Sequence, residues 1–140
     1  MTPYVELSAR SAFSFLEAAS TPEHLVDEAA RLEVPALGLL DVDGLYGAPR
    51  FYKAARAAGV RPLVGAALTL GDGTRLGLLV ESRAGYQALG RLITRVKARA
   101  PKGQARATLD DLDGVAGLLC LTGGADGPLT PDLLAGRLAR

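Results

Sequence analysis

The stretch Ala36-Leu37-Gly38-Leu39-Leu40, followed by Asp41, decides the fold class of this 140-residue chain. A continuous run of apolar and small residues predicts a strand that is buried on both faces, as in a parallel sheet that helices cover on both sides. Pro35 ends the helical pattern before this strand. The strand therefore places Asp41 at its carboxyl end, where reactive groups gather in α/β proteins.

Short apolar segments alternate with helical patterns on either side of this strand, which is typical of βα units in a mainly parallel sheet. The clearest helix start is Ser20-Thr21-Pro22-Glu23, which offers a capping hydroxyl, a first-turn proline and a capping-box glutamate. Gly71-Asp72-Gly73-Thr74 is a hairpin signal, so one antiparallel pair is expected. Strands are expected at residues 4–7, 36–40, 60–64, 66–70, 75–80 and 115–121, and helices at 22–32, 49–58, 83–96, 108–112 and 131–140.

Composition narrows the class of protein. With 49% hydrophobic and 22% charged residues the chain is expected to form one soluble globular domain. The net charge is only +1, so any contact with DNA would be local. No apolar segment reaches the roughly 20 residues of a membrane helix, and no signal peptide is evident, so we expect a cytoplasmic protein without membrane contact. Cys120 lies in an apolar segment and is expected to be buried rather than reactive.

Other short motifs do not point to chemistry. Asp41-Val42-Asp43-Gly44 is not a calcium loop, because Leu39 and Arg50 stand where the first ligand and the closing glutamate should be. A turn or helix-capping role is expected for Asp41 and Asp43 instead. His24 is expected at the surface, and Gly123-Gly124 is expected in a turn, because it lacks a full phosphate-binding pattern.

One basic concentration could contact nucleic acid. Its possible contacts are Arg91, Arg95, Lys97, Arg99 and Lys102, with Arg106 beyond them. A solvated helix face is the favoured interpretation, because no aromatic residues that could stack on bases are interleaved with these cations.

Five ordered segments resemble the PHP domain at the N-terminus of bacterial DNA polymerase III alpha subunits, especially their error-prone relatives. Residues 4–20 resemble the opening L-H-x-H-S and Y-S-x-L-D-G-A-S motifs, and residues 40–47 resemble T-D-H-G-x-x-x-G. Further similarity lies at residues 50–67, 85–95 and 117–124. The resemblance implies a distorted (βα) barrel, of which residues 1–140 would be an incomplete N-terminal portion without palm, fingers or thumb.

The family's metal ligands are not matched. Members that hold metals use both histidines of H-x-H, the Asp-His pair of T-D-H-G and a later glutamate. At these positions the chain carries Ser8 and Arg10, then Asp41 with Val42, then Ala67, so only the aspartate is retained. A lone carboxylate beside a fixed cation does not form a divalent metal site. We therefore expect no metal, no cofactor and no catalysis by this chain alone.

The first functional hypothesis is a PHP segment of an error-prone type polymerase, with a structural or partner-binding role among polymerase or repair subunits. Replication and damage-tolerant repair synthesis are what the family implies. A free-standing metal-dependent phosphoesterase of the same superfamily is the enzymatic alternative. A nucleic-acid-binding accessory protein that uses residues 91–106 is another. An incomplete barrel is also expected to self-associate through its exposed strand edges.

Overall fold

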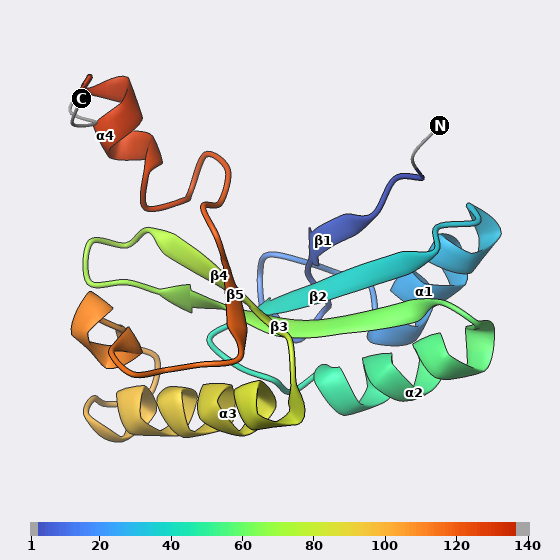
Figure 1. Ribbon diagram of the computed structural model, residues 1–140, viewed down its shortest axis with the longest axis horizontal. Helices are drawn as coiled ribbons and strands as arrows, with labels where there is room; N and C mark the ends of the chain where they lie inside the picture. Colours follow the sequence, from blue (N-terminus) through green and yellow to red (C-terminus); the bar gives the residue numbers. More distant parts are fainter. Residues whose placement is uncertain (1–2, 137–140) are drawn as a thin grey trace.

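The computed structural model describes residues 3–136 and contains one five-stranded sheet of order β1-β2-β3-β4-β5 (Figure 1). The strands are β1 (Glu6–Ala9), β2 (Ala36–Val42), β3 (Arg61–Thr69), β4 (Arg75–Val80) and β5 (Leu118–Leu121). The helices are α1 (Pro22–Arg31), α2 (Ala48–Ala58), α3 (Arg83–Ala98) and α4 (Thr130–Leu134), with a 3₁₀ turn η1 (Leu109–Leu112). Strands β1, β2 and β3 are parallel, and β4 is antiparallel to both β3 and β5.

The α/β class and the hairpin are confirmed, but two details of the sheet differ from expectation. The two short strands expected on either side of Gly65 are one long strand, β3, which pairs with β2 and then continues into the hairpin. Gly65 is needed there because a Cβ would lie 2.1 Å from the carbonyl oxygen of Leu78. A second antiparallel pair, β4 with β5, was not expected; it forms because β5 fills the free edge of β4.

Local sequence signals position the helices. Thr21 caps α1, because its hydroxyl accepts a hydrogen bond from the His24 N–H at 3.3 Å. The expected capping box is wrong. With Thr21 as the N-cap, Glu23 is the second residue of the helix and not the third, and its carboxylate pairs with Arg50 of α2. Gly59 ends α2 with φ of 74°, and the end of this helix agrees with the expected range of 49–58.

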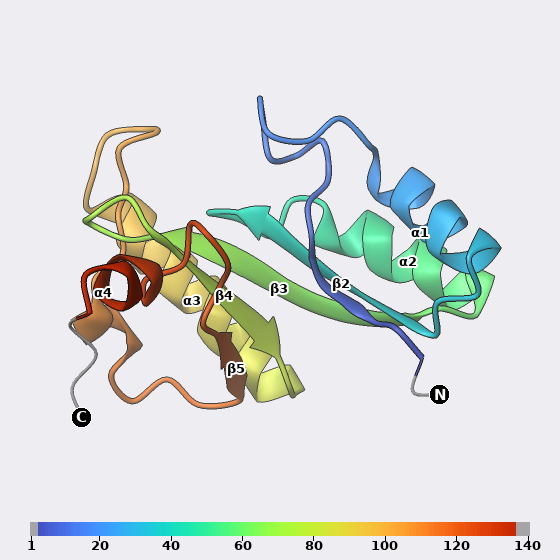
Figure 2. The same cartoon turned by 90° about the horizontal axis from the view of Figure 1, so that it is seen from above.

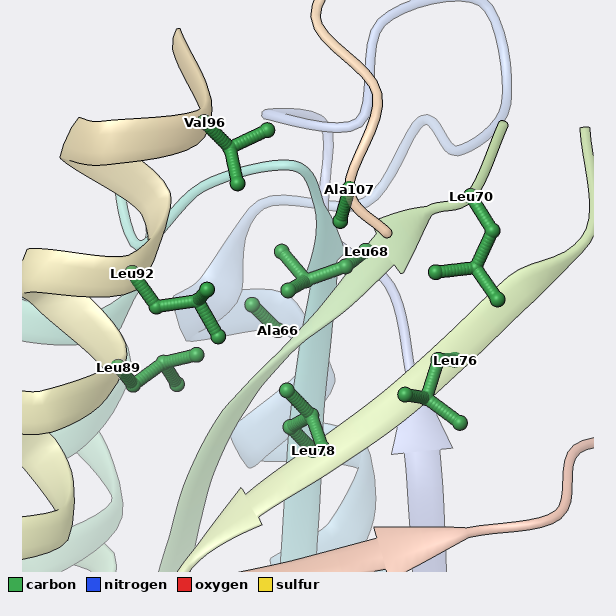
Figure 3. Packing of buried hydrophobic residues seen from close by; sticks show 9 residues of the cluster. All are labelled: Ala66, Leu68, Leu70, Leu76, Leu78, Leu89, Leu92, Val96 and Ala107. Carbon is green, nitrogen blue, oxygen red and sulfur yellow. The ribbon is translucent and has the colours of Figure 1, made fainter. Parts of the chain in front are cut away.

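The three long helices pack on one face of the sheet. Figure 3 shows Leu89 and Leu92 of α3 pointing toward Leu68 of β3 and Leu78 of β4. Helices α1 and α2 continue this layer over β2 around the fully buried Phe51. In Figure 1, α2 and α3 lie below the sheet and α4 stands above it.

Strand β2 is buried on both faces, but helices cover only one of them. On the other face Leu40, Ala67 and Leu79 form a small cluster. Leucines of β1, β3 and β5 cover this cluster (Leu7, Leu63 and Leu121). The expected burial is therefore confirmed, while the expected cover of helices on both sides is wrong.

Two expectations near the C-terminal part need correction. Cys120 is exposed, because β5 is an edge strand with β4 as its only paired neighbour in the sheet. The last helix is shorter than expected: α4 ends at Leu134, and residues 137–140 lie outside the described residues. Within residues 3–136 no helix has the length and apolar character needed to cross a membrane.

Candidate functional site: a cleft on the open face of the sheet

A cleft of about 640 Å³ lies on the sheet face opposite the three long helices. It contains three positions singled out in the sequence: Ser8 and Arg10, at and just after the end of β1, and Ala67 of β3. Arg75 and Gly77 of β4 form another wall, and residues 121–126 close the cleft from the end of β5. The topology thus brings together residues from the whole length of the chain.

Four alternating charges cross this cleft. Arg10 lies 3.2 Å from a carboxylate oxygen of Glu17 and 3.0 Å from one of Asp126, and Arg75 binds the same Glu17. Hydrogen bonding from Arg75 holds the pKa of Glu17 below its usual value. Hydrogen bonding from Arg10 does the same to the pKa of Asp126. Both carboxylates are therefore ionised near neutral pH, and each is paired with a guanidinium.

Asp41 lies at the carboxyl end of β2 and is 1% exposed. Its Oδ1 accepts hydrogen bonds from the Ser11 N–H at 2.7 Å and the Ser14 hydroxyl at 2.9 Å, and its Oδ2 accepts one from the Ser11 hydroxyl at 2.7 Å. The Ser14 hydroxyl in turn accepts a hydrogen bond from the Val42 N–H at 3.0 Å. Asp41 therefore fastens the loop of residues 10–20 to the end of the sheet.

Asp43 has a similar role at the neighbouring strand. It accepts hydrogen bonds at 2.7 Å from both the N–H and the hydroxyl of Thr69. These contacts join residues 26–30 positions apart, so the two aspartates fasten distant segments and do not make the local turn or helix-capping bonds that were expected.

The side chains at the five positions that the resemblance singled out are engaged in other contacts or carry no ligand atoms. The Ser8 hydroxyl donates to Glu6, and Val42 and Ala67 are register partners without ligand atoms in their side chains. Asp41 is occupied by its three donors, and the nearest ion-pair system already contains two guanidinium groups. In the part of the chain that is described, no three His, Cys, Asp or Glu residues converge as metal ligands would.

The basic residues from 91 to 102 do not form one patch. Arg99 donates to the Asp111 carboxylate at 2.6 Å, and Arg95 donates to the Asp111 carbonyl oxygen at 2.6 Å, so both stabilise the η1 turn. Lys97 donates to the Tyr46 hydroxyl at 2.8 Å on another side of α3. Lys102 lines the same hollow as Lys97, whereas Arg91 lines a different one.

Sequence reasoning missed Glu17, Arg75 and Asp126. Arg75 and Glu17 are 58 residues apart in the sequence, and Arg10 and Asp126 are 116 residues apart. No spacing rule for helices or strands connects positions so far apart, and isolated charges on loops are common. Only the assembled sheet identifies them.

The Asp111 carboxylate predicts a stability change in acid. It is nearly buried and accepts hydrogen bonds from Arg99 and from the Thr108 backbone, which lower its pKa from 3.8 to about 2. Its contribution is therefore complete above about pH 4 and is lost as pH falls toward 2. After allowance for the solvent around Arg99, we expect about 1–2 kcal/mol of unfolding free energy. Urea denaturation should give free energies of unfolding for the native protein and for Asp111→Asn that become more alike as pH falls from about 4 to 2. A difference between the two proteins that stays constant over this pH range would contradict the assignment.

Comparisons with known proteins agree with this architecture. The PHP domain family matches residues 6–140. The error-prone DNA polymerase of Mycolicibacterium paratuberculosis is 47% identical over 126 residues, covering 82% of this chain and 12% of the polymerase. The chain thus spans about one eighth of the length of the curated relatives it matches.

Two solved structures share the fold. One, from Bifidobacterium adolescentis and described as a metal-dependent phosphoesterase, has a TM-score of 0.51 and 17% identity over 69% of this chain and 35% of that protein. The other, an amidohydrolase from Chromobacterium violaceum, has a TM-score of 0.53 and 24% identity over 67% of this chain and 33% of that protein. At such identities the likeness concerns the fold alone. The family match and the 47% identity to an error-prone DNA polymerase together show that the chain belongs to the PHP domain family.

Proposed function

We propose that this chain is the N-terminal PHP segment of an error-prone type DNA polymerase III alpha subunit, with a degenerate metal site and a structural or partner-binding role. The observation that carries this proposal is the position of Arg10, whose guanidinium lies in the cleft between Glu17 and Asp126. Residues 1–140 form one portion of that domain, since the match covers only 12% of a relative's length.

The charges in the cleft support a degenerate metal site. A divalent cation neutralises and organises carboxylates, and two fixed guanidinium groups already do this for Glu17 and Asp126. A metal entering the cleft would have to compete with Arg10 and Arg75 for Glu17 and Asp126, and it would find Asp41 already bonded to three donors. The ion pairs therefore support the loops around the cleft in place of metal-ligand bonds.

The names of the relatives support the biological setting that we propose. Error-prone DNA polymerases act on DNA, so a cytoplasmic location and a contribution to replication or repair synthesis are part of the proposal. The partners would be other polymerase or repair subunits. A free-standing metal-dependent phosphoesterase is the weaker alternative, because among residues 3–136 no metal-ligand cluster supports it.

Metal titration tests the proposal directly. The purified protein should show the same unfolding free energy in EDTA, Zn²⁺ or Mn²⁺, because ligands that bind only the folded state would stabilise it. It should also release no phosphate from p-nitrophenyl phosphate. A stabilisation of about 2.7 kcal/mol, expected when the metal is at 100 times its Kd, would overturn the proposal, as would metal-dependent phosphatase activity.

A rebuilt site provides the positive control. The changes Ser8→His, Arg10→His, Val42→His and Ala67→Glu place donors at the four positions where the family ligands are missing. This variant should bind Zn²⁺ by calorimetry, while the protein with the single change Ala67→Glu should not. Zinc binding by the rebuilt protein alone would confirm that the assay can detect a metal in this cleft.

A further inference from the structure

A second hollow, of about 740 Å³, lies between the loop of residues 10–20 and the loop that follows α3. Figure 2 shows both loops projecting from the same side of the molecule. The hollow shares no lining residue with the cleft. The side chains that define its chemistry are Phe13, Phe15, Asp43, Tyr46, Lys97 and Lys102.

Two aromatic side chains of this hollow, Phe15 and Tyr46, are largely exposed to solvent. Phe15 is 80% exposed and Tyr46 is 61% exposed. Leu16, beside Phe15, is fully exposed and has a φ of 65°, a conformation that is costly for a residue other than glycine. The loop holds this shape because Ser11 and Ser14 are fastened to the buried Asp41. A rigid loop therefore presents Phe15 to solvent.

The charges around the hollow are mainly positive. Lys97 lies 4.7 Å from the centre of the Tyr46 ring and donates to its hydroxyl, and Lys102 is exposed on the facing loop. The Asp43 carboxylate offsets one of these two positive charges, so one positive charge remains in excess among the lining residues. Arg50 lies 5.8 Å from the centre of the Phe13 ring, but Glu23, with which it forms an ion pair, offsets its charge.

We propose that this hollow binds single-stranded nucleic acid. Exposed aromatic rings beside cations are the features by which proteins stack unpaired bases and attract phosphates. Phe15 provides the main stacking surface, Tyr46 a second one, and Lys97 and Lys102 lie where phosphates would pass. An acidic or apolar peptide is less well matched, because exposed rings opposite the amines of Lys97 and Lys102 suit bases joined by phosphates.

The sequence alone argued against such a site, because no aromatic residue is interleaved with the cations. In space Tyr46 lies beside Lys97, although 51 residues separate them. Binding here does not depend on the state of the cleft.

A tryptophan reporter tests for stacking. The chain contains no tryptophan, so Phe15→Trp gives a single tryptophan at the proposed stacking surface, which is excited selectively over the four tyrosines. Oligothymidine of about 16 nucleotides, the upper end of the site size for one small domain, should quench it at low salt. Tyr52→Trp on α2, at a similarly exposed aromatic position, should not be quenched. No quenching of the Phe15→Trp protein, or equal quenching of both reporters, would overturn the proposal.

Binding of labelled oligothymidine, measured by fluorescence anisotropy, separates stacking from general charge. Phe15→Ala and Lys102→Glu should each raise Kd about tenfold. Matched changes on α2, Tyr52→Ala and Lys53→Glu, should alter Kd less than about twofold. All four side chains are largely exposed, so the variants should remain folded, which circular dichroism checks. Equal losses in both pairs, or inorganic polyphosphate competing as well as oligothymidine, would contradict a base-stacking site.

Discussion

Asp41→Ala is expected to lower the free energy of unfolding by about 3–5 kcal/mol, as for other buried charged groups whose partners are left unpaired. The change leaves the Ser11 N–H and two serine hydroxyls without their acceptor in a buried position. It also leaves a cavity next to Gly47, where even a Cβ would lie 2.6 Å from the Asp41 carboxylate. Urea unfolding followed by circular dichroism measures the loss.

Asp72→Ala is the matched control for this change. Asp72 also accepts hydrogen bonds from an N–H and a hydroxyl, both of Thr74, but it lies in the exposed hairpin turn. Water replaces those bonds, so the loss there should stay below about 1 kcal/mol. The difference in unfolding free energy between the two variants should be the same with and without EDTA, because Asp41 is expected to hold a loop and not a metal ion. Equal losses at the two positions would show that burial of Asp41 contributes little.

Gly85→Ala and Gly90→Ala should change stability in opposite directions, although both lie in α3. A Cβ on Gly85 would lie 1.8 Å from the carbonyl oxygen of Gly117, and a backbone atom cannot rotate away. Relieving this overlap must separate α3 from the segment that leads into β5, at a cost of about 3 kcal/mol.

A Cβ on Gly90 meets nothing within 4 Å, and alanine is favoured over glycine inside a helix by about 1 kcal/mol. Thermal unfolding should therefore rank Gly90→Ala above the unaltered protein and Gly85→Ala well below it. Two variants that both melt at a higher temperature would mean that α3 does not approach Gly117 so closely.

Features set by neighbouring residues were predictable from the sequence. Thr21, Gly59 and Ser82 mark helix ends through bonds or dihedral angles that involve only a few adjacent positions. The hairpin at residues 71–74 and the buried strand β2 follow from equally local patterns.

Features that depend on the assembled sheet were not predictable. The pairing of β4 with β5, the exposure of Cys120 and the one-sided cover of helices all depend on which strands become neighbours. The resemblance located Ser8, Arg10 and Ala67 at the cleft, but the partners of Arg10 could be found only in three dimensions.

The Arg10–Asp126 ion pair has a consequence for the order in which the molecule assembles. It joins the residues that follow β1 and β5, the two outer strands of the sheet, across 116 positions of the chain. Contacts between residues so far apart in the sequence form after local contacts, because closing a long loop costs entropy. Folding of the intervening helices and strands lowers that cost first. We therefore expect the cleft to be completed late during folding, after the local contacts of the helices and the hairpin have formed.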